Sequence, residues 1–172
     1  MSRSKNIGAI VCLVAFAFFA GWPVWRWLSA KSVSANLQRR TQVLVEKDPR
    51  DPELRYLLGT ALLHQHKFAE AQAELIAALK LKPGMGEAYG DLALAASENK
   101  EYPLALQALD ARAKLLPETP ATYFLRATCY DHLRAFKQAA ESYRQFLAVA
   151  GGKYPDQEWQ ARHRLIAIEP RK

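Results

Sequence analysis

Hydrophobic residues follow two different patterns along this chain of 172 residues. The segment from Ile7 to Trp25 is an apolar run without a charged residue. As a helix with a rise of 1.5 Å per residue it would extend for about 28 Å, close to the hydrocarbon thickness of a bilayer. Beyond this run, apolar and polar residues are mixed as in an ordinary soluble helical domain. The pattern predicts one transmembrane helix followed by an all-α domain.

The end of the apolar run carries side chains that suit a membrane interface. Trp22, Trp25 and Trp27 cluster there, and Arg26 and Lys31 accompany them. Indole rings are apolar with one N–H group, and long cationic side chains extend to lipid headgroups. A buried core helix is the alternative, but a helix that is apolar on every face needs a larger core around it than the remaining chain supplies. We therefore expect the lipid bilayer to surround residues 7–25.

The apolar run is expected to remain part of the mature protein. It is longer than the hydrophobic region of a cleaved signal peptide, and no small-x-small cleavage site follows it. Residues 1–31 are thus predicted to be an uncleaved signal anchor. Arg3 and Lys5 precede the span, and such a short basic N-terminus usually stays in the cytoplasm. This orientation predicts a single-pass protein of a bacterial inner membrane, with its soluble domain on the periplasmic side.

The soluble part of the sequence repeats itself with a period of 34 residues. The columns of like residues include Gly59, Ala93 and Ala127; Ala71, Ala105 and Ala139; Phe68, Tyr102 and Phe136; and Pro49, Pro83 and Pro117. Small residues let the two helices of a pair approach closely, and the aromatic residues are expected to fill the wedge between pairs. Because proline lacks an N–H group and disfavours helix in the preceding residue, Pro83 and Pro117 are expected to end second helices.

These columns resemble the tetratricopeptide repeat family. The resemblance implies an α-solenoid of three helix-turn-helix repeats, which are residues 52–85, 86–119 and 120–153. Three residues depart from the family pattern: Arg112 replaces a small residue, Arg126 replaces leucine and Gly151 replaces proline. We expect Leu125 to supply the contact that Arg126 lacks, through a small rotation of the helix.

One helix is predicted on each side of the three repeats. Residues 32–51 are expected to form an incomplete repeat with a helix from Ser34 to Lys47. Residues 154–172 are expected to form a capping helix, with Asp156 at its N-cap. The residues expected to cover the open edge of the third repeat are Trp159, Leu165 and Ile168. The residues of this helix expected to face water are Arg162 and Arg164.

No spacing of chemical residues in the sequence indicates an enzyme. It has no Gly-rich phosphate loop, no Cys-x-x-Cys motif and no matched pair of Glu-x-x-His sets, so we expect no catalytic residue, cofactor or metal ion. Of the net charge of +7, residues 1–30 carry +3, and the remaining +4 is spread thinly along the helices. Without a block of like charges we expect no nucleic-acid partner. Cys12 lies in the apolar run and Cys129 in a predicted helix, so they are not expected to pair.

In the tetratricopeptide repeat family, the first helices line a concave face that binds protein segments. The resemblance places on this face Tyr56, Thr60, Leu63, His64, Leu94, Glu98, Phe124, Thr128, Asp131 and His132. Tyr56 and Phe124 are predicted to be aromatic anchors, with His64, Asp131 and His132 adding polar selectivity. The alternative is that both rings, and equally the two leucines, pack in the core. A groove with this mixture suits a short helix or an extended peptide.

Two functions agree with these features. The first is a non-enzymatic adaptor, scaffold or assembly factor, tethered to the membrane, which binds a protein or peptide partner of an envelope complex in its concave groove. The second is a permanent structural subunit of a larger membrane complex, held there by its transmembrane helix. The repeat pattern is specific for the fold and does not identify the partner.

Overall fold

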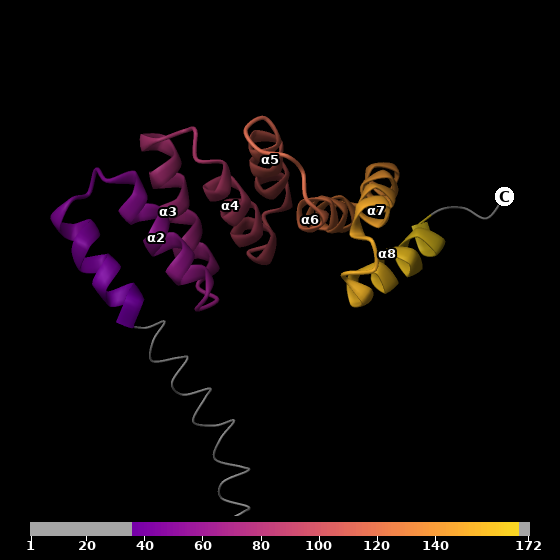
Figure 1. Cartoon of the computed structure of the whole chain (residues 1–172), viewed down its shortest axis with the longest axis horizontal. Coiled ribbons are helices and arrows are strands. Elements are labelled where there is room, and N and C mark those ends of the chain that lie inside the picture. Colours follow the sequence, from indigo (N-terminus) through magenta and orange to yellow (C-terminus); the bar gives the residue numbers. More distant parts are fainter. Residues whose placement is uncertain (1–35, 169–172) are drawn as a thin grey trace, which may run out of the picture.

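The computed structural model describes residues 36–168, which form helices joined by short turns. Figure 1 shows the helices side by side in chain order. Residues 36–47 are helical, and the labelled helices that follow are α2 (Pro52–Leu63), α3 (Phe68–Leu81), α4 (Gly86–Glu98), α5 (Tyr102–Ala113), α6 (Pro120–His132), α7 (Phe136–Ala150) and α8 (Pro155–Ile168). The described part of the chain contains no strand. The predicted all-α fold of paired helices is confirmed.

The helices form a chain of helix-turn-helix pairs. Each of α2, α4 and α6 packs most closely against the helix that follows it, and α3 and α5 also contact the first helix of the next pair. The first helices begin at Pro52, Gly86 and Pro120, which are 34 residues apart in each step. The array is therefore a solenoid in which each pair packs on the next, and the buried residues of the described part of the chain form three core clusters.

Small residues bring the two helices of a pair into contact, as their period predicts. A Cβ atom at Gly59 would lie only 2.8 Å from Cγ of Leu75 and 3.4 Å from the carbonyl oxygen of Ala71. Ala105 and Ala139 occupy the positions in the other two pairs that correspond to Ala71, and both are completely buried. A larger side chain at these positions has no space unless the helices separate.

The turn inside each pair repeats a backbone feature that the sequence does not display. His66, Lys100 and Arg134 have φ angles of 58°, 64° and 58°, in the left-handed region that non-glycine residues seldom adopt. They too are 34 residues apart. In each turn the next amide donates to the carbonyl five residues before it, for example Glu101 to Ala96. This bond caps the end of the first helix and reverses the chain direction.

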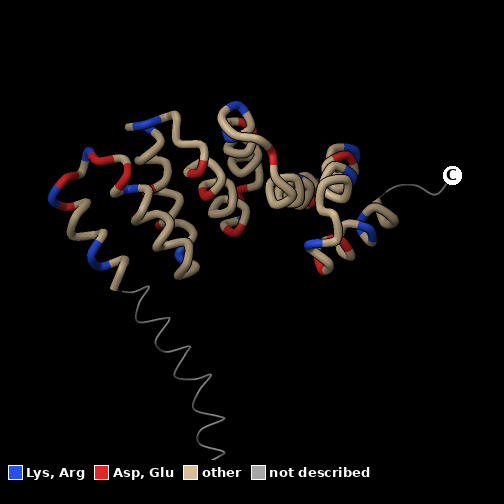
Figure 2. The backbone as a smooth tube through the Cα atoms, in the orientation of Figure 1, with Lys and Arg blue, Asp and Glu red and all other residues tan. Residues whose placement is uncertain are grey.

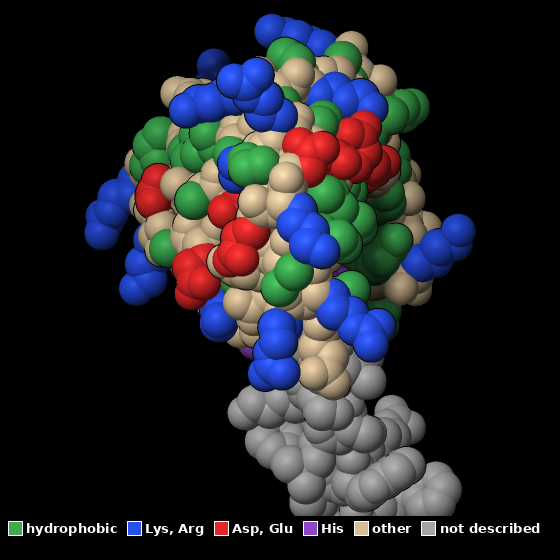
Figure 3. Space-filling model, turned by 90° about the vertical axis from the view of Figure 1, so that its left-hand side faces the viewer, with side chains coloured by type: hydrophobic (Ala, Val, Ile, Leu, Met, Phe, Trp, Pro, Cys, Tyr) green, Lys and Arg blue, Asp and Glu red, His purple; other side chains and the backbone are tan. Residues whose placement is uncertain are grey.

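The first helical segment packs on the array through part of its surface. Residues 36–47 are helical within the predicted range from Ser34 to Lys47, and Val45 belongs to the same core cluster as α2 and α3. Figure 3 views this end of the molecule, where hydrophobic side chains lie exposed among charged ones. The exposed hydrophobic residues of this segment and α2 are Leu37, Val43, Leu44 and Leu57.

The prediction for residues 7–25 lies outside the residues that the structure describes. Between residues 36 and 168, no helix is both long enough and apolar enough to cross a bilayer.

At the other end, α8 covers the third pair, although not in the predicted way. Leu165 and Ile168 pack against the core cluster of α6 and α7 as expected, but Trp159 is 61% exposed. The N-cap prediction for Asp156 is wrong, because α8 begins at Pro155 and Asp156 lies inside its first turn. Among the aromatic residues expected between the pairs, Phe136 is also largely exposed.

Candidate functional site

A groove of about 780 Å³ lies along the first helices of the second and third pairs. Its walls come from α4 and α6, its floor from α5 and α7, and its far end from the start of α8. The lining residues are Glu87, Gly90, Leu94, Ser97, Glu98, Lys100, Tyr102, Leu109, Arg112, Ala121, Thr122, Phe124, Leu125, Thr128, His132, Phe146, Tyr154 and Gln157. The groove thus combines an apolar floor with polar and charged groups at its edges.

Half of the predicted groove residues line this groove. Leu94 and Glu98 come from α4, and Phe124, Thr128 and His132 come from α6. Leu94 is 43% exposed, so it presents its side chain to the groove rather than to the core. These residues come together because equivalent faces of successive first helices lie side by side in a solenoid.

Phe124 is held firmly in the wall of the groove. Its ring lies 5.1 Å from that of Phe146 and 6.1 Å from that of Tyr143, both on α7, and the ring planes are inclined at 59° and 66°. Such inclined aromatic pairs are favourable beyond the area that they bury. Phe124 therefore belongs partly to the core and partly to the groove, between the two alternatives that the sequence left open.

The imidazole of His132 closes one side of the groove by stacking on Tyr102. The ring centroids are 4.5 Å apart and the planes differ by only 4°. Tyr102 is the first residue of α5, so this contact joins the second and third pairs. Sequence reasoning placed Tyr102 between the pairs without assigning it to the groove, although its place in the aromatic column was the available signal.

The floor of the groove contains a buried arginine that lies against a glycine. Arg112 is 7% exposed and donates a hydrogen bond of 2.9 Å to the carbonyl oxygen of Pro117. A Cβ atom at Gly90 would lie 3.4 Å from Cδ and Nε of Arg112, so the guanidinium stem packs against bare backbone. Arg112, which departs from the family pattern, thus lies against the backbone at Gly90, where an added Cβ would make only ordinary van der Waals contact.

The other unusual arginine joins neighbouring helices outside the groove. Arg126 pairs with Asp110 of α5 and, at 2.9 Å, with Glu118 in the turn before α6. These pairs hold the pKa of Arg126 above its ordinary value, although burial opposes that shift. Leu125 packs against two core clusters, which agrees with the expectation that it replaces the missing leucine contact.

The predicted residues of α2, together with His64 at its C-cap, do not line this groove. Leu63 is 9% exposed and belongs to the core cluster, so its assignment to the concave surface is corrected. Ala61, Leu62 and Leu63 are all buried, so the buried face of α2 is wide enough at its last turn to include Leu63. His64 is exposed, and Tyr56 and Thr60 are half-buried.

Tyr56 and Thr60 take part in a polar contact between the first and second pairs. The hydroxyl of Thr60 donates to Oδ2 of Asp91 at 3.1 Å. Burial raises the pKa of Asp91, an effect that the hydrogen bonds from Thr60 and Tyr56 partly oppose. Burial and the nearby Asp91 carboxylate also raise the pKa of Tyr56. The contact joins α2 to α4, with the carboxylate of Asp91 as the acceptor.

Asp131, predicted to add polar selectivity to the concave face, lines the smaller hollow beside the groove and forms an ion pair there. The guanidinium of Arg164, on α8, donates to both carboxylate oxygens of Asp131, at 2.6 Å and 2.5 Å. Arg164 is still exposed to water, as predicted, while it makes this pair, and Arg162 pairs with Glu158 at the surface. Bidentate pairs between arginine and carboxylate are among the strong hydrogen-bonded contacts of proteins. The contact fixes α8 on α6.

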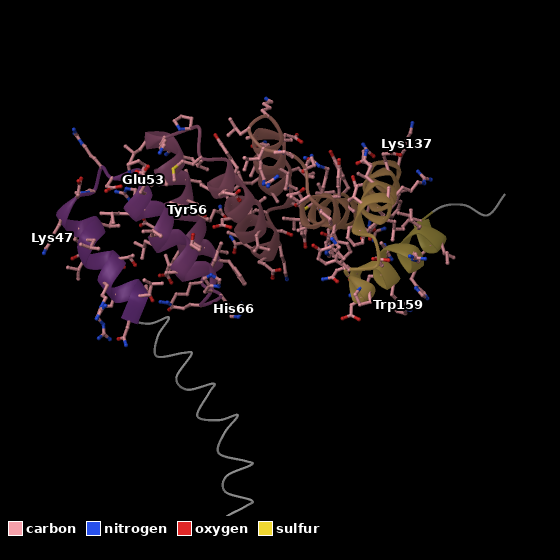
Figure 4. The ribbon with its side chains drawn as sticks, in the orientation of Figure 1. Lys47, Glu53, Tyr56, His66, Lys137 and Trp159 are labelled. Carbon is pink, nitrogen blue, oxygen red and sulfur yellow. The ribbon has the colours of Figure 1, made fainter. Side chains whose placement is uncertain are left out.

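A second, smaller hollow of about 280 Å³ continues the groove toward α8. Thr128 and His132 line both hollows, and Trp159 stands at the outer edge, with its ring 3.9 Å from that of His163. Figure 4 shows Trp159 on α8 and Tyr56 on α2 toward opposite ends of the array. Sequence reasoning did not anticipate that α8 extends the concave surface as well as capping the third pair.

A chain of helix pairs with a 34-residue period and a groove along its first helices is an α-solenoid of the tetratricopeptide type. Residues 56–114 match the sequence model of the family named Tetratricopeptide repeat. Within the chain, residues 56–114 are thus similar to that repeat in sequence. No curated protein sequence matches the chain.

Solved structures share this fold. A MamA structure from Desulfovibrio magneticus RS-1 is 19% identical, with a TM-score of 0.66 over 85% of this chain and 92% of that chain. A second MamA structure is also 19% identical, with a TM-score of 0.67 over 82% and 85% of the two chains. The TPR domain of Arabidopsis OM64 is 21% identical, with a TM-score of 0.57 over 65% and 94%. At these identities the likeness concerns the fold alone.

Tetratricopeptide repeats are typically protein-binding modules and not enzymes. Residues 56–114 therefore match a repeat that is typical of protein–protein interaction modules.

Proposed function

We propose that this protein is a membrane-tethered adaptor or scaffold that holds a protein partner of an envelope complex in the groove between α4, α6 and α8. The observation that carries the proposal is the groove of about 780 Å³, with the exposed Leu94 on one wall and Phe124 on the other. Rigid apolar and aromatic side chains in a concave surface commonly supply most of the energy of binding. Polar groups around them fix the orientation of the bound segment.

The tether is proposed from the sequence. The uncharged run from Ile7 to Trp25 suits the thickness of a bilayer, and the short basic N-terminus favours a periplasmic groove at a bacterial inner membrane. Removing residues 1–30 should release the protein into the soluble fraction of disrupted cells after a carbonate wash. Retention of the shortened chain in the membrane pellet would show that another segment makes the membrane contact.

Affinity purification of the full chain in detergent tests the adaptor role against the permanent subunit. An adaptor should co-purify its partner at a low ratio that falls as salt is raised, because its contacts form and dissociate. A constant ratio in every preparation, unchanged by salt, would instead identify a structural subunit and refute the adaptor role.

A further inference from the structure

Around the groove, most positively charged side chains are already paired, whereas several negatively charged ones are not. Of the basic residues on the first helices, Arg55 pairs with Glu74 of α3 at 2.9 Å. The other, Arg126, is held by carboxylates of α5 and the following turn. Helix α4 itself contains no Lys or Arg. The first helices therefore direct no free cation into the groove.

The cations that reach the groove from other elements are mostly committed. Arg112 is buried on the floor and donates to the carbonyl oxygen of Pro117. In the adjoining hollow, Arg164 is neutralised by Asp131. Lys100 is exposed, but it lies in the turn between α4 and α5, at one end of the groove. His132 is exposed and stacks on Tyr102 through the face of its ring.

The carboxylates of α4, in contrast, are mostly not paired with a cation. Glu87, Asp91 and Glu98 follow the helical spacing of one face, and the exposed Leu94 lies between them. Glu87 and Glu98 are exposed and line the groove. Among the described residues neither of them forms an ion pair. The negative charge of Glu87 also contributes to the raised pKa of Asp91. The carboxylates on this wall are thus close enough to affect one another.

We infer that the groove takes a basic peptide segment, with apolar side chains between Leu94 and Phe124 and Lys or Arg residues paired with Glu87 and Glu98. The inference rests on the proposed function and specifies the partner. Figure 2 shows Lys and Arg mostly on the turns and the terminal helices, with acidic positions on the middle helices. Although the chain carries a net charge of +7, its free charges in the groove are thus mainly negative.

The spacing of the two glutamates limits the arrangement of the cations. Eleven helical steps separate Glu87 from Glu98, or about 16 Å along α4. An extended peptide covers that distance in roughly five residues, and a bound helix needs about eleven. The apolar residue that meets Leu94 should lie between the two cations, nearer to the one paired with Glu98.

The test uses the full chain in detergent and a random peptide library displayed on phage. Peptides that bind should be enriched in Lys and Arg on both sides of an apolar residue. Their affinity should fall by about tenfold for a Glu87→Gln, Glu98→Gln variant, and the remaining binding should depend less on salt. The control is a Glu70→Gln, Glu141→Gln variant, which changes the same charge on second helices, where both side chains are exposed. It should bind like the unchanged protein.

Two outcomes would overturn the inference in different ways. If selected peptides lose binding to a Leu94→Asp variant but carry no excess of Lys or Arg, or bind the Glu87→Gln, Glu98→Gln variant equally well, the basic partner is refuted and the groove stands. If no peptide is recovered, or Leu94→Asp leaves binding unchanged while the variant melts normally, the proposed function fails together with the inference.

Discussion

Ala71 and Ala105 show how single positions set the spacing of the whole array. Both are fully buried between the two helices of a pair, and the Cβ distances at Gly59 show that the first pair has no room for another carbon. Because protein interiors are packed as densely as organic crystals, an added side chain must move a helix rather than fill a void. The period of these residues is therefore a consequence of helix contact.

Replacing Ala71 or Ala105 by Leu should lower the free energy of unfolding by about 1–3 kcal/mol through overpacking. Thermal melts followed by circular dichroism measure the change. The matched control is Ala69→Leu, an exposed position on the same helix as Ala71, which should melt close to the unchanged protein. Equal melting of all the variants would contradict the helix contacts described here.

The pairing of Gly90 with Arg112 shows what residue patterns leave out. A list of usual residue types marks Arg112 as a departure, whereas the structure shows its side chain lying against the backbone of the facing helix. The sequence contained both residues of this contact. They could be joined only by knowing that the two positions face each other in adjacent helices, which the period alone does not supply.

Helix α8 is the element whose role differs most from its prediction. It packs through Ala161, Leu165 and Ile168 as a cap, but it also lines the groove through Gln157 and anchors itself through Arg164. The side chain of Asp131 is only 12% exposed, so losing its arginine would leave a poorly hydrated carboxylate. The ion pair thus couples the position of the cap to the wall of the groove.

Replacing Arg164 by Gln should loosen α8 and destabilise it by about 1 kcal/mol. Hydrogen exchange measured by mass spectrometry should report faster exchange in residues 155–168 than in α4 or α6. The neighbouring Arg162→Gln is the matched control, because Arg162 only pairs with Glu158 within the same helix, a contact that contributes a few tenths of a kcal/mol. Equal exchange in both variants would mean that the pair with Asp131 does not hold the helix.

For the whole molecule, the sequence predicted what depends on helix periodicity and missed what depends on distant side chains. The helix pairs and the buried alanines follow from one repeated spacing, so they were accessible. The contact of Asp131 with a residue 33 positions away was not, since residues of the repeat say nothing about the charge on a capping helix. Leu63 was assigned to the concave surface, but it is buried in the core at the end of α2.

The central claim is that the concave surface of the second and third pairs holds a protein partner. A photoreactive amino acid placed at position 94 of the full chain, in living cells, tests it most directly. Position 57 is the control, because Leu57 is also an exposed leucine on a first helix, 50% exposed against 43% for Leu94, but does not line the groove. A discrete crosslinked product is expected from position 94 and none from position 57. Products from position 57 alone, or the same products from both positions, would contradict it.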